Sequence, residues 1–431
     1  MNRRIVHIVG AGIAGLSAAV ELVESGHEVV IHEAAPAAGG RCRSYHDQAL
    51  DLRIDNGNHL LLSGNHAAID YVRRIGSLPT LKGPPSAVFD FADLRSGERW
   101  QLRPNDGRVP WWVLIPGRAV PKTALRGYLS PLRLFRAPAS ATIAQAMTRS
   151  GVLYERLWRP LLLAALNTDP SEGAATLAAT VFRETLGAGG RACRPMIASQ
   201  GLSASFIDPA VAFLAARDAT IGYGERLRAI RIERGRAVEL DFGVGRATSL
   251  DADAVLLLAV PPSSARELLP AFDAPDESRA IVNAHFRRSP PPDHPLILGV
   301  INGLTEWLFA YPEYLSVTIS AADRLLDRPR DELARDIWRE ITTLTGLGED
   351  LPPWQIVKER RATFAATPAQ EARRPSARTA WANVVLAGDW TRTGLPASIE
   401  GAVRSGYNAA AIIKGMSALA PQNRVAMDAQ P

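Results

Sequence analysis

The sequence predicts an α/β fold built on a parallel sheet, and three short apolar runs predict it. The first run, Ile5 to Val9, leads into a glycine-rich turn and a helical pattern. The second, Ala254 to Ala259, stops at two prolines, and the third, Asn383 to Ala387, opens into a Gly-Asp pair. Continuous apolar runs of this length are typical of strands that are covered on both faces, as in a parallel sheet.

The turn after the first run has the pattern G-x-G-x-x-G, in which Gly10, Gly12 and Gly15 surround Ala14. Gly10 makes the tight turn, Gly12 lets a pyrophosphate approach the backbone, and Gly15 lets the helix that follows pack closely on the strand. The free N–H groups at the start of that helix favour a phosphate. We therefore predict a Rossmann-like unit that holds the ADP moiety of a cofactor.

Glu33 ends the next strand-like run, 18 residues after Gly15. A carboxylate at this position accepts hydrogen bonds from the ribose hydroxyls of adenosine and disfavours a 2′-phosphate, so NADP is not the expected occupant. A secretory signal would also begin with basic residues and an apolar stretch. Glu21 and Glu24 lie within this stretch and no cleavage site precedes Glu33, so we reject that interpretation.

The composition limits the class of protein. Of the 431 residues, 47% are hydrophobic and 22% are charged, and the formal net charge is +5. These values are ordinary for a globular protein, and aromatic and basic residues are not interleaved as in a nucleic-acid site. Two cysteines, Cys42 and Cys193, give no disulfide framework and no metal site, which favours a reduced, cytoplasmic setting. No uncharged apolar run reaches about 18 residues, so we expect any membrane contact to be peripheral.

Two loops after the first unit are candidates for ligand contact. In residues 34–44, Gly40 is followed by Arg41 and Arg43. Such a loop can fold over a diphosphate with arginine as the counter-charge, although a solvated basic turn is the alternative. The stretch Asp55 to His59 places polar side chains directly before an apolar run. A turn around a ligand and a simple Asx-type turn explain this stretch equally well.

The middle of the chain predicts both helices and strands. Helical patterns occupy 143–166, 174–186 and 330–344, and strand patterns occupy 219–221, 227–232, 237–242, 296–301, 307–311 and 314–319. Leu227 is a candidate to line an adenine.

An apolar patch, Trp111 to Ile115, precedes several basic residues between Arg118 and Arg136. This is the composition of a surface that rests on a bilayer. Core aromatic residues beside exposed arginines are the alternative interpretation.

The third apolar run ends at Gly388 and Asp389, and a helix is predicted from Ile399 to about Ile413. Asp389 can bind a sugar-alcohol hydroxyl, or a diphosphate through water, or it is a turn residue before the helix. The N–H groups at 399–401 and the missing side chain of Gly401 suit a flat ring that carries negative charge. The tail after Ser417 is polar, without an apolar period, and we expect it to fray.

The N-terminal motif with Glu33, the GGRCRS loop and the segment LAGDWTRTGLPASIEGAVRSGYNAA resemble the superfamily of FAD-dependent amine oxidases and carotenoid desaturases. The resemblance implies an FAD-binding domain assembled from residues 1–75, 206–262 and 380–416, an inserted α+β substrate domain of residues 76–205 and 263–379, and a polar tail of residues 417–431. The implied FAD-binding residues are Gly10, Gly12, Ala14, Gly15 and Glu33 for ADP, Gly40, Arg41 and Arg43 for the diphosphate, Gly388 and Asp389 for the ribityl-diphosphate region, and Ile399, Glu400, Gly401 and Ala402 near the flavin. The superfamily usually has a valine at the adenine, where this chain offers Leu227 or Ile230.

Within that superfamily, DNGNHLLLSGN (Asp55 to Asn65) and GDWTRTGLPASIEGA are similar to the hydroxysqualene dehydroxylases of bacterial hopanoid synthesis. This resemblance implies an oxidoreductase that reduces hydroxysqualene to squalene, with loss of water and with hydride from reduced FAD. The substrate would be a long apolar isoprenoid, and the protein would be cytoplasmic with peripheral contact to the membrane face. His59 and Asp55 are the candidates for the catalytic acid, while Asp55 also suits ordering of its loop and His59 a place in the core.

Three other functions stay open. A carotenoid desaturase would use oxidised flavin and remove hydrogens, and an amine oxidase would use a polar, aromatic-lined pocket and oxygen. The lack of a lysine at an evident flavin-side position weakens an amine substrate. A flavin-holding scaffold without turnover would not need the close approach at Gly401. No second dinucleotide fingerprint identifies the electron donor.

Overall fold

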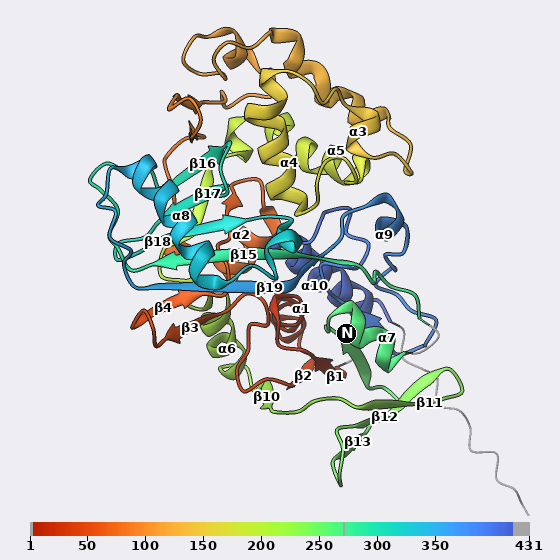
Figure 1. The fold of residues 1–431 in the computed structure, drawn as a ribbon. Coiled ribbons are helices and arrows are strands. Elements are labelled where there is room, and N and C mark those ends of the chain that lie inside the picture. Colours follow the sequence, from red (N-terminus) through yellow and green to blue (C-terminus); the bar gives the residue numbers. More distant parts are fainter. Residues whose placement is uncertain (1–2, 270–271, 417–431) are drawn as a thin grey trace, which may run out of the picture.

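The computed structural model describes residues 3–269 and 272–416, so the predicted polar tail lies outside the described residues (Figure 1). A parallel sheet has the strand order β10-β2-β1-β14-β20. Its strands are β1 (Ile5–Val9), β2 (Glu28–Glu33), β10 (Thr220–Tyr223), β14 (Val255–Leu258) and β20 (Val384–Leu386). The three apolar runs of the sequence thus form three neighbouring strands, β1, β14 and β20, which confirms the predicted α/β fold.

Two helices, α1 (Ile13–Glu24) and α10 (Ile399–Lys414), cover one face of this sheet. Helix α6 (Asp208–Ala215) packs on α1, and α2 (His66–Arg74) packs on α10. A Cβ at Gly406 of α10 would overlap the Ser17 hydroxyl of α1, so glycine lets these two helices pack closely. Their buried side chains form one apolar cluster with the sheet, to which Ile8, Leu16 and Val403 belong.

The opposite side carries a small antiparallel sheet of β11 (Ala229–Glu233), β12 (Arg236–Asp241) and β13 (Ala247–Ser249). Further along the chain, α7 (Pro262–Leu268) follows strand β14. The Phe242 ring contacts the His32 ring of β2 at a centroid distance of 4.7 Å. The strand predicted from residue 227 begins at Ala229, so Leu227 precedes it.

A second, seven-stranded sheet has the order β19-β15-β18-β17-β16-β7-β8. Its strands are β7 (Phe89–Asp93), β8 (Arg99–Leu102), β15 (Ser278–Phe286), β16 (Ile297–Ile301), β17 (Trp307–Ala310), β18 (Leu315–Ile319) and β19 (Trp354–Phe364). The amphipathic helix α8 (Arg330–Thr345) packs its apolar stripe, including Ile337, on Val282 and Val317 of one face. The predicted strands at 296–301, 307–311 and 314–319 all belong to this sheet.

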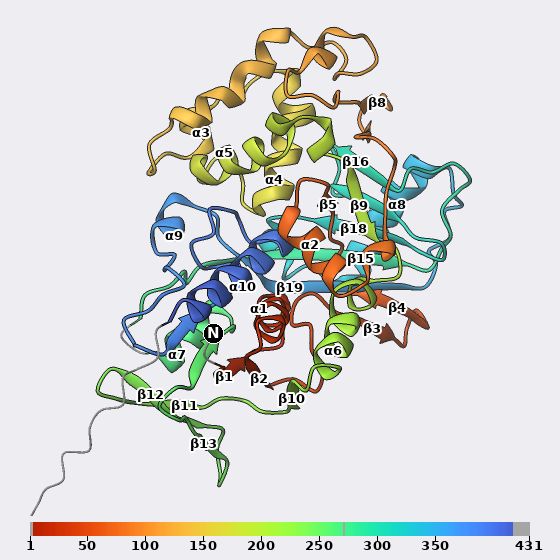
Figure 2. The same ribbon diagram turned by 180° about the vertical axis from the view of Figure 1, so that it is seen from behind.

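A mostly helical cap stands at the top of Figures 1 and 2, drawn in orange to yellow. It contains 3-10 turns at Trp111–Leu114 and Leu125–Arg136, then α3 (Ile143–Ala146), a π-helical turn (Tyr154–Trp158), α4 (Arg159–Leu166) and α5 (Ala175–Glu184). The helical patterns predicted for 143–166 form separate elements, because α3 ends at Ala146 and Gly151 has a φ of 98°.

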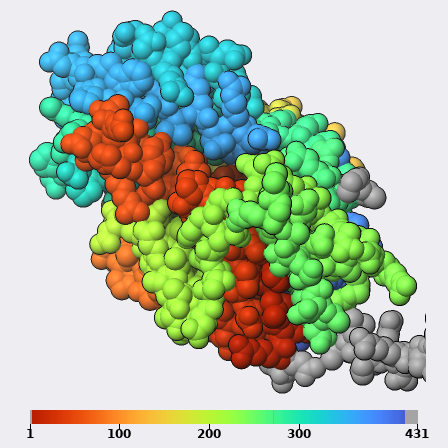
Figure 3. All heavy atoms as spheres, turned by 90° about the horizontal axis from the view of Figure 1, so that it is seen from below, coloured from red at the N-terminus to blue at the C-terminus, as the bar shows by residue number. Residues whose placement is uncertain are grey.

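Short elements connect these layers. They are β3 (Ser44–Asp47), β4 (Leu52–Asp55), β5 (Leu61–Leu62), β6 (Leu81–Lys82), β9 (Pro195–Ala198) and α9 (Pro368–Ala372). In Figure 3 the orange-red β3–β4 hairpin lies between the blue β19 and the lime-coloured α6. Gln355 donates to Asp47 at 2.7 Å on one side, and Arg53 pairs with Asp208 at 3.1 Å on the other. The domain boundaries given above stay a prediction.

Candidate functional site

The glycine-rich turn lies at the carboxyl end of β1, where each glycine has a different surrounding. Gly10 has a φ of 107°, and a Cβ there would overlap the carbonyl oxygen of Ala259. A Cβ at Gly15 would overlap the carbonyl oxygen of Gly10, so the helix packs directly on the turn. At Gly12, however, a Cβ would meet no protein atom within 4 Å. Protein packing therefore does not require glycine at position 12, while the close approach of a ligand to the backbone would.

The start of α1 also suits an anion. Gly12 is the N-cap residue and provides no side-chain cap, so the N–H groups of the first turn, which includes Ala14, stay available to an anion. Glu33 lies beside the same turn, because its Oε2 accepts from the Ala11 N–H at 2.7 Å and its Oε1 from the Ala35 N–H at 2.8 Å. The structure thus fixes the Glu33 carboxylate at the carboxyl end of β2.

The predicted diphosphate loop lies directly against this turn. Gly39 forms a parallel bridge with Gly12, and its N–H donates to the Ala11 carbonyl at 2.8 Å. Gly40 follows with a φ of 56°, a conformation that favours glycine. The exposed guanidinium of Arg43 donates to the Gly40 carbonyl at 2.9 Å. This bond suits the alternative of a solvated turn residue for Arg43.

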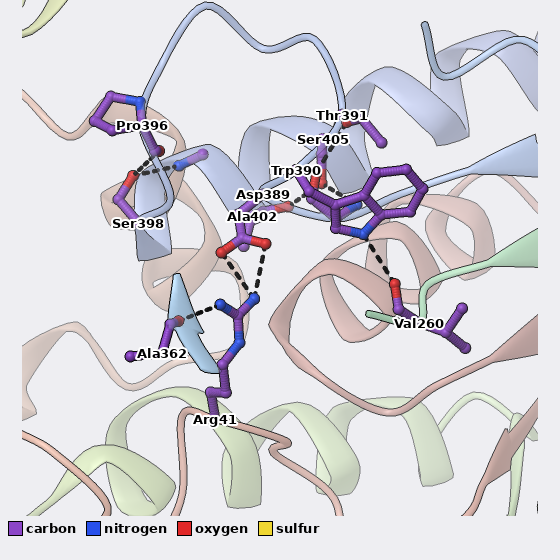
Figure 4. A network of polar contacts seen from close by, with 12 residues as sticks. Arg41, Val260, Ala362, Asp389, Trp390, Thr391, Pro396, Ser398, Ala402 and Ser405 are labelled. Carbon is purple, nitrogen blue, oxygen red and sulfur yellow. Dashed lines mark hydrogen bonds and ion pairs between the residues drawn. The ribbon is translucent and has the colours of Figure 1, made fainter. Parts of the chain in front are cut away.

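Arg41 brings together two predicted site segments that are 348 residues apart in the sequence. Its Nη2 donates to both oxygens of Asp389 at 2.7 Å, and its Nη1 donates to the Ala362 carbonyl of β19 (Figure 4). The charge of Asp389, which is buried, raises the pKa of Arg41. A charge-assisted, two-oxygen contact of this kind holds the loop at 39–43 against the end of β20 and the edge of the second sheet.

The Gly-Asp turn after β20 is fixed from several sides. The Gly388 N–H donates to the Ser405 hydroxyl of α10 at 2.8 Å, and the Trp390 indole donates to the Val260 carbonyl at 2.9 Å (Figure 4). Ser398 caps α10 by accepting from the Gly401 N–H at 3.1 Å. Ile399, buried, and Ala402, half-buried, lie in the first turn of the helix.

Two residues at this helix have contacts within the protein, and their place near the flavin stays a prediction. Glu400, predicted near the flavin, accepts from the N–H groups of Ala67 and Ala68 at 3.2 and 2.8 Å, so its carboxylate caps α2. A Cβ at Gly401 would lie 3.1 Å from the Pro396 carbonyl oxygen and 3.2 Å from the Ser398 hydroxyl. The tight space at Gly401 therefore arises within its own capping turn.

Asp55 and His59, the candidates for the catalytic acid, lie in environments that shift their pKa values in opposite directions, and their catalytic role stays a prediction. The Asp55 carboxylate is buried, and one oxygen accepts from the Ser44 hydroxyl at 2.6 Å and the Leu202 N–H at 2.8 Å. These bonds order β3, β4 and the turn at Leu202, as the alternative for Asp55 stated, while burial raises its pKa. Burial and the nearby charge of Arg41 lower the pKa of His59 to about 4, so its imidazole is neutral at neutral pH.

Sequence reasoning missed other residues that shape the site. Arg374, which is fully buried, donates to the carbonyl oxygens of Leu395 and Asp389 at 2.8 and 3.1 Å, and so holds the segment after β20. Arg374 stands beside Arg373 in a polar, basic stretch of the chain, so it gave no sequence signal. Leu227 is buried just before β11 and belongs to the same apolar cluster as Leu240 and Leu256, and its place beside an adenine stays a prediction.

Comparison with known proteins finds the same family as the sequence resemblance, and the similarity extends over nearly the whole chain. Residues 13–414 match the family model of the flavin containing amine oxidoreductases. Hydroxysqualene dehydroxylase from Rhodopseudomonas palustris is 54% identical over 95% of this chain and 98% of its own length, and that from Sinorhizobium fredii is 54% identical over 94% and 97%. A probable zeta-carotene desaturase from Synechococcus elongatus is 24% identical over 96% and 99%. Among solved structures, cyclohexylamine oxidase from Brevibacterium oxydans shares the fold at a TM-score of 0.66, with 16% identity over 96% of this chain and 99% of that one.

Proposed function

We propose that this chain, which belongs to the flavin-containing amine oxidoreductase family and within it to the hydroxysqualene dehydroxylases, reduces hydroxysqualene to squalene with FAD as its cofactor. The observation that carries the proposal is identity of 54% over 95% of the chain with a relative of that name. The desaturase relative is far more distant, at 24% identity. Desaturation and amine oxidation are therefore the weaker alternatives.

The residues of the site fit FAD. The open position at Gly12, the uncapped start of α1 and the carboxylate of Glu33 lie together, as an ADP moiety requires. Arg41 and Asp389 lie beside the same turn and would hold the diphosphate and ribityl parts. Reduced FAD supplies a hydride to the substrate carbon when bound. The chain itself binds the cofactor, orients the isoprenoid and keeps water away from the carbon that loses its hydroxyl.

The proposed activity is tested with the FAD-loaded protein under anaerobic conditions. The protein is reduced with dithionite, freed of excess reductant and given hydroxysqualene in detergent. We expect squalene to form in step with the return of the oxidised flavin spectrum, one molecule for each flavin. A reduced flavin that hydroxysqualene does not reoxidise would contradict the proposal, and reduction of the oxidised flavin by an amine or a carotene would identify an alternative.

We further propose that the helical cap rests on a membrane surface. No helix in the described part of the chain is long and apolar enough to cross a membrane. The cap nevertheless exposes a set of large apolar side chains, named here the cap surface: Val109, Trp111, Leu114, Ile115, Leu125, Leu129, Leu132 and Phe135. Exposed basic residues lie among them: Arg108, Lys122, Arg126, Arg133 and Arg136. Apolar anchors with basic neighbours favour an anionic bilayer, which supports a peripheral place on the cytoplasmic membrane face.

The structure corrects one member of the predicted patch. Trp112 is only 5% exposed and packs edge-on against Tyr128 at a centroid distance of 5.5 Å. Trp112 is therefore a core residue, as the alternative interpretation stated, whereas Trp111 is 46% exposed. Replacing Trp112 would test folding rather than membrane contact.

Replacing Leu114 and Leu129 together with glutamate is expected to weaken binding to anionic liposomes by at least about tenfold, because two apolar anchors are lost and two like charges are added. Both side chains are more than half exposed, so the fold should not suffer. The measurement is co-sedimentation with vesicles of phosphatidylglycerol and phosphatidylethanolamine. The matched control is Val244→Glu, which changes a fully exposed residue in the β12–β13 turn, at the opposite end of the molecule in Figure 1. Equal binding by both variants would refute the cap surface as the membrane contact.

A further inference from the structure

The seven-stranded sheet has two unlike faces. Val282, Ala284 and Val317 point to α8, whereas the residues between them in β15 and β18 point to the other side. There the register pairs Asn283 with Thr318 and His285 with Ser316. These four residues, named here the polar row, are fully buried except for the half-buried Thr318. Because unpaired polar groups are costly to bury, a row of them at the centre of a sheet requires partners.

Asn58 supplies these partners from the loop after β4. Its Nδ2 donates to the Ser316 hydroxyl at 2.8 Å and to the Thr318 hydroxyl at 3.0 Å. Among the described residues, its Oδ1 accepts only from the Tyr311 hydroxyl, at 3.3 Å. The two donors of Asn58 are therefore well satisfied, while its oxygen makes the longest and weakest bond of the three.

The hydrogen bonding of the polar row is also incomplete at His285. Nδ1 of His285 lies 2.8 Å from the Ser316 hydroxyl, and its Nε2 is buried without a hydrogen-bond partner among the described residues. Burial lowers the pKa of His285 to about 4, so the ring is neutral at neutral pH. A neutral ring in this position orients the Ser316 hydroxyl, which in turn fixes the amide of Asn58.

The loop of Asn58 lies between the polar row and the proposed cofactor site. The N–H of Asn56 donates to the Arg43 carbonyl at 2.9 Å, which joins this loop directly to residues 39–43. The Asn56 side chain donates to Glu359 of β19 at 3.4 Å, and Arg41 donates to the Ala362 carbonyl of the same strand. An oxygen bound beside Asn58 would thus lie near the loop that we assign to the FAD diphosphate.

We propose that Asn58 and Tyr311 form the subsite that binds the hydroxyl group of the substrate, an inference that rests on the proposed function. The alcohol oxygen accepts from the Tyr311 hydroxyl and donates to Oδ1 of Asn58, in place of the 3.3 Å bond between the two side chains. Burial raises the pKa of Tyr311 well above its usual value, so the phenol keeps its proton and stays a donor. Once the oxygen has left as water, Tyr311 and Asn58 pair again, and the hydrocarbon product faces no unpaired polar group.

The test is the affinity of the oxidised, FAD-loaded protein for hydroxysqualene and for squalene, which needs no turnover. Tyr311→Phe removes one hydroxyl and keeps the ring stacked on Tyr314, whose centroid is 4.5 Å away. We expect the affinity for hydroxysqualene to fall about tenfold, the size of one lost hydrogen bond to a ligand, and the affinity for squalene to stay unchanged. The matched control is Tyr314→Phe, because the Tyr314 hydroxyl makes no hydrogen bond within the described residues and its removal should change neither affinity.

Other outcomes would overturn the subsite. Equal losses for both ligands in Tyr311→Phe would show a packing role, and an unchanged preference for the alcohol would show that its oxygen binds elsewhere. Both variants are checked first for bound FAD and for their melting temperature. A wild-type protein that turns hydroxysqualene over but binds the two ligands equally well would refute the subsite alone. A wild-type protein that neither binds nor reduces hydroxysqualene would refute the proposed function as well.

Discussion

Gly12→Val is expected to abolish FAD binding while leaving the protein folded. The two methyl groups of valine would occupy the space in which the pyrophosphate approaches the backbone at the start of α1. The protein itself offers no obstacle, because no protein atom lies within 4 Å of a Cβ at this position. We expect the ratio of FAD to protein after purification to fall at least about tenfold, with an unchanged far-ultraviolet circular dichroism spectrum.

Substitutions at two other glycines serve as controls for Gly12→Val. Gly15→Val should damage the fold itself, because even a Cβ would overlap the Gly10 carbonyl oxygen. Gly348→Val lies in the connection between α8 and β19, has open space around its Cβ and should behave like the wild type. Retention of FAD by Gly12→Val would show that the cofactor does not approach the backbone there, and loss of structure in the same variant would show that the glycine is needed for folding.

The parallel sheet and its glycine turn could be predicted because their signals are local. The segment from Ile5 to Glu33 holds a strand, three spaced glycines, a helix and a second strand in one continuous stretch. The long strands β15 and β19 could not be predicted with equal ease. In β19, charged residues such as Lys358 and Arg361 interrupt the apolar pattern, since this edge strand pairs on one side only. Pairing with β15 stabilises it, and that contact is invisible in the sequence.

The candidate site shows the same division between local and distant causes. The loop at 39–43 and the Gly-Asp turn could each be recognised, but nothing in the sequence indicates that Arg41 and Asp389 bind one another. The helix start at 399–402 was recognised, but nothing in the sequence indicates that Glu400 caps the N-terminus of α2. The polar row had a usable signal, since polar and apolar residues alternate in both β15 and β18. The role that we propose for the polar row depends on its contact with Asn58, and only the fold brings Asn58 to the row.

Arg374 is the buried cation on which the segment after β20 depends. Its side chain is fully buried and contacts the ring of Phe364 at 4.9 Å from the centroid. The guanidinium donates to the carbonyl oxygens of Asp389, Trp390, Thr391 and Leu395 and to the Thr393 hydroxyl, and it pairs with Glu371 at 2.7 Å. A single side chain thus satisfies most of the backbone acceptors of this turn, and the turn carries Asp389.

Arg374→Met is therefore expected to lower the free energy of unfolding by about 3–5 kcal/mol, because several buried carbonyl groups and the Glu371 carboxylate lose their partner at once. Methionine keeps much of the volume, so a large loss reports on the polar contacts rather than on a cavity. The matched control, Arg378→Met, replaces an exposed arginine four residues along the chain and should change the free energy by no more than about 0.5 kcal/mol. Both are measured by urea unfolding of the FAD-loaded protein. Weaker FAD binding should accompany the loss of stability in Arg374→Met, since Asp389 then loses its fixed position. Equal stability of the two variants would mean that the turn holds its shape without Arg374.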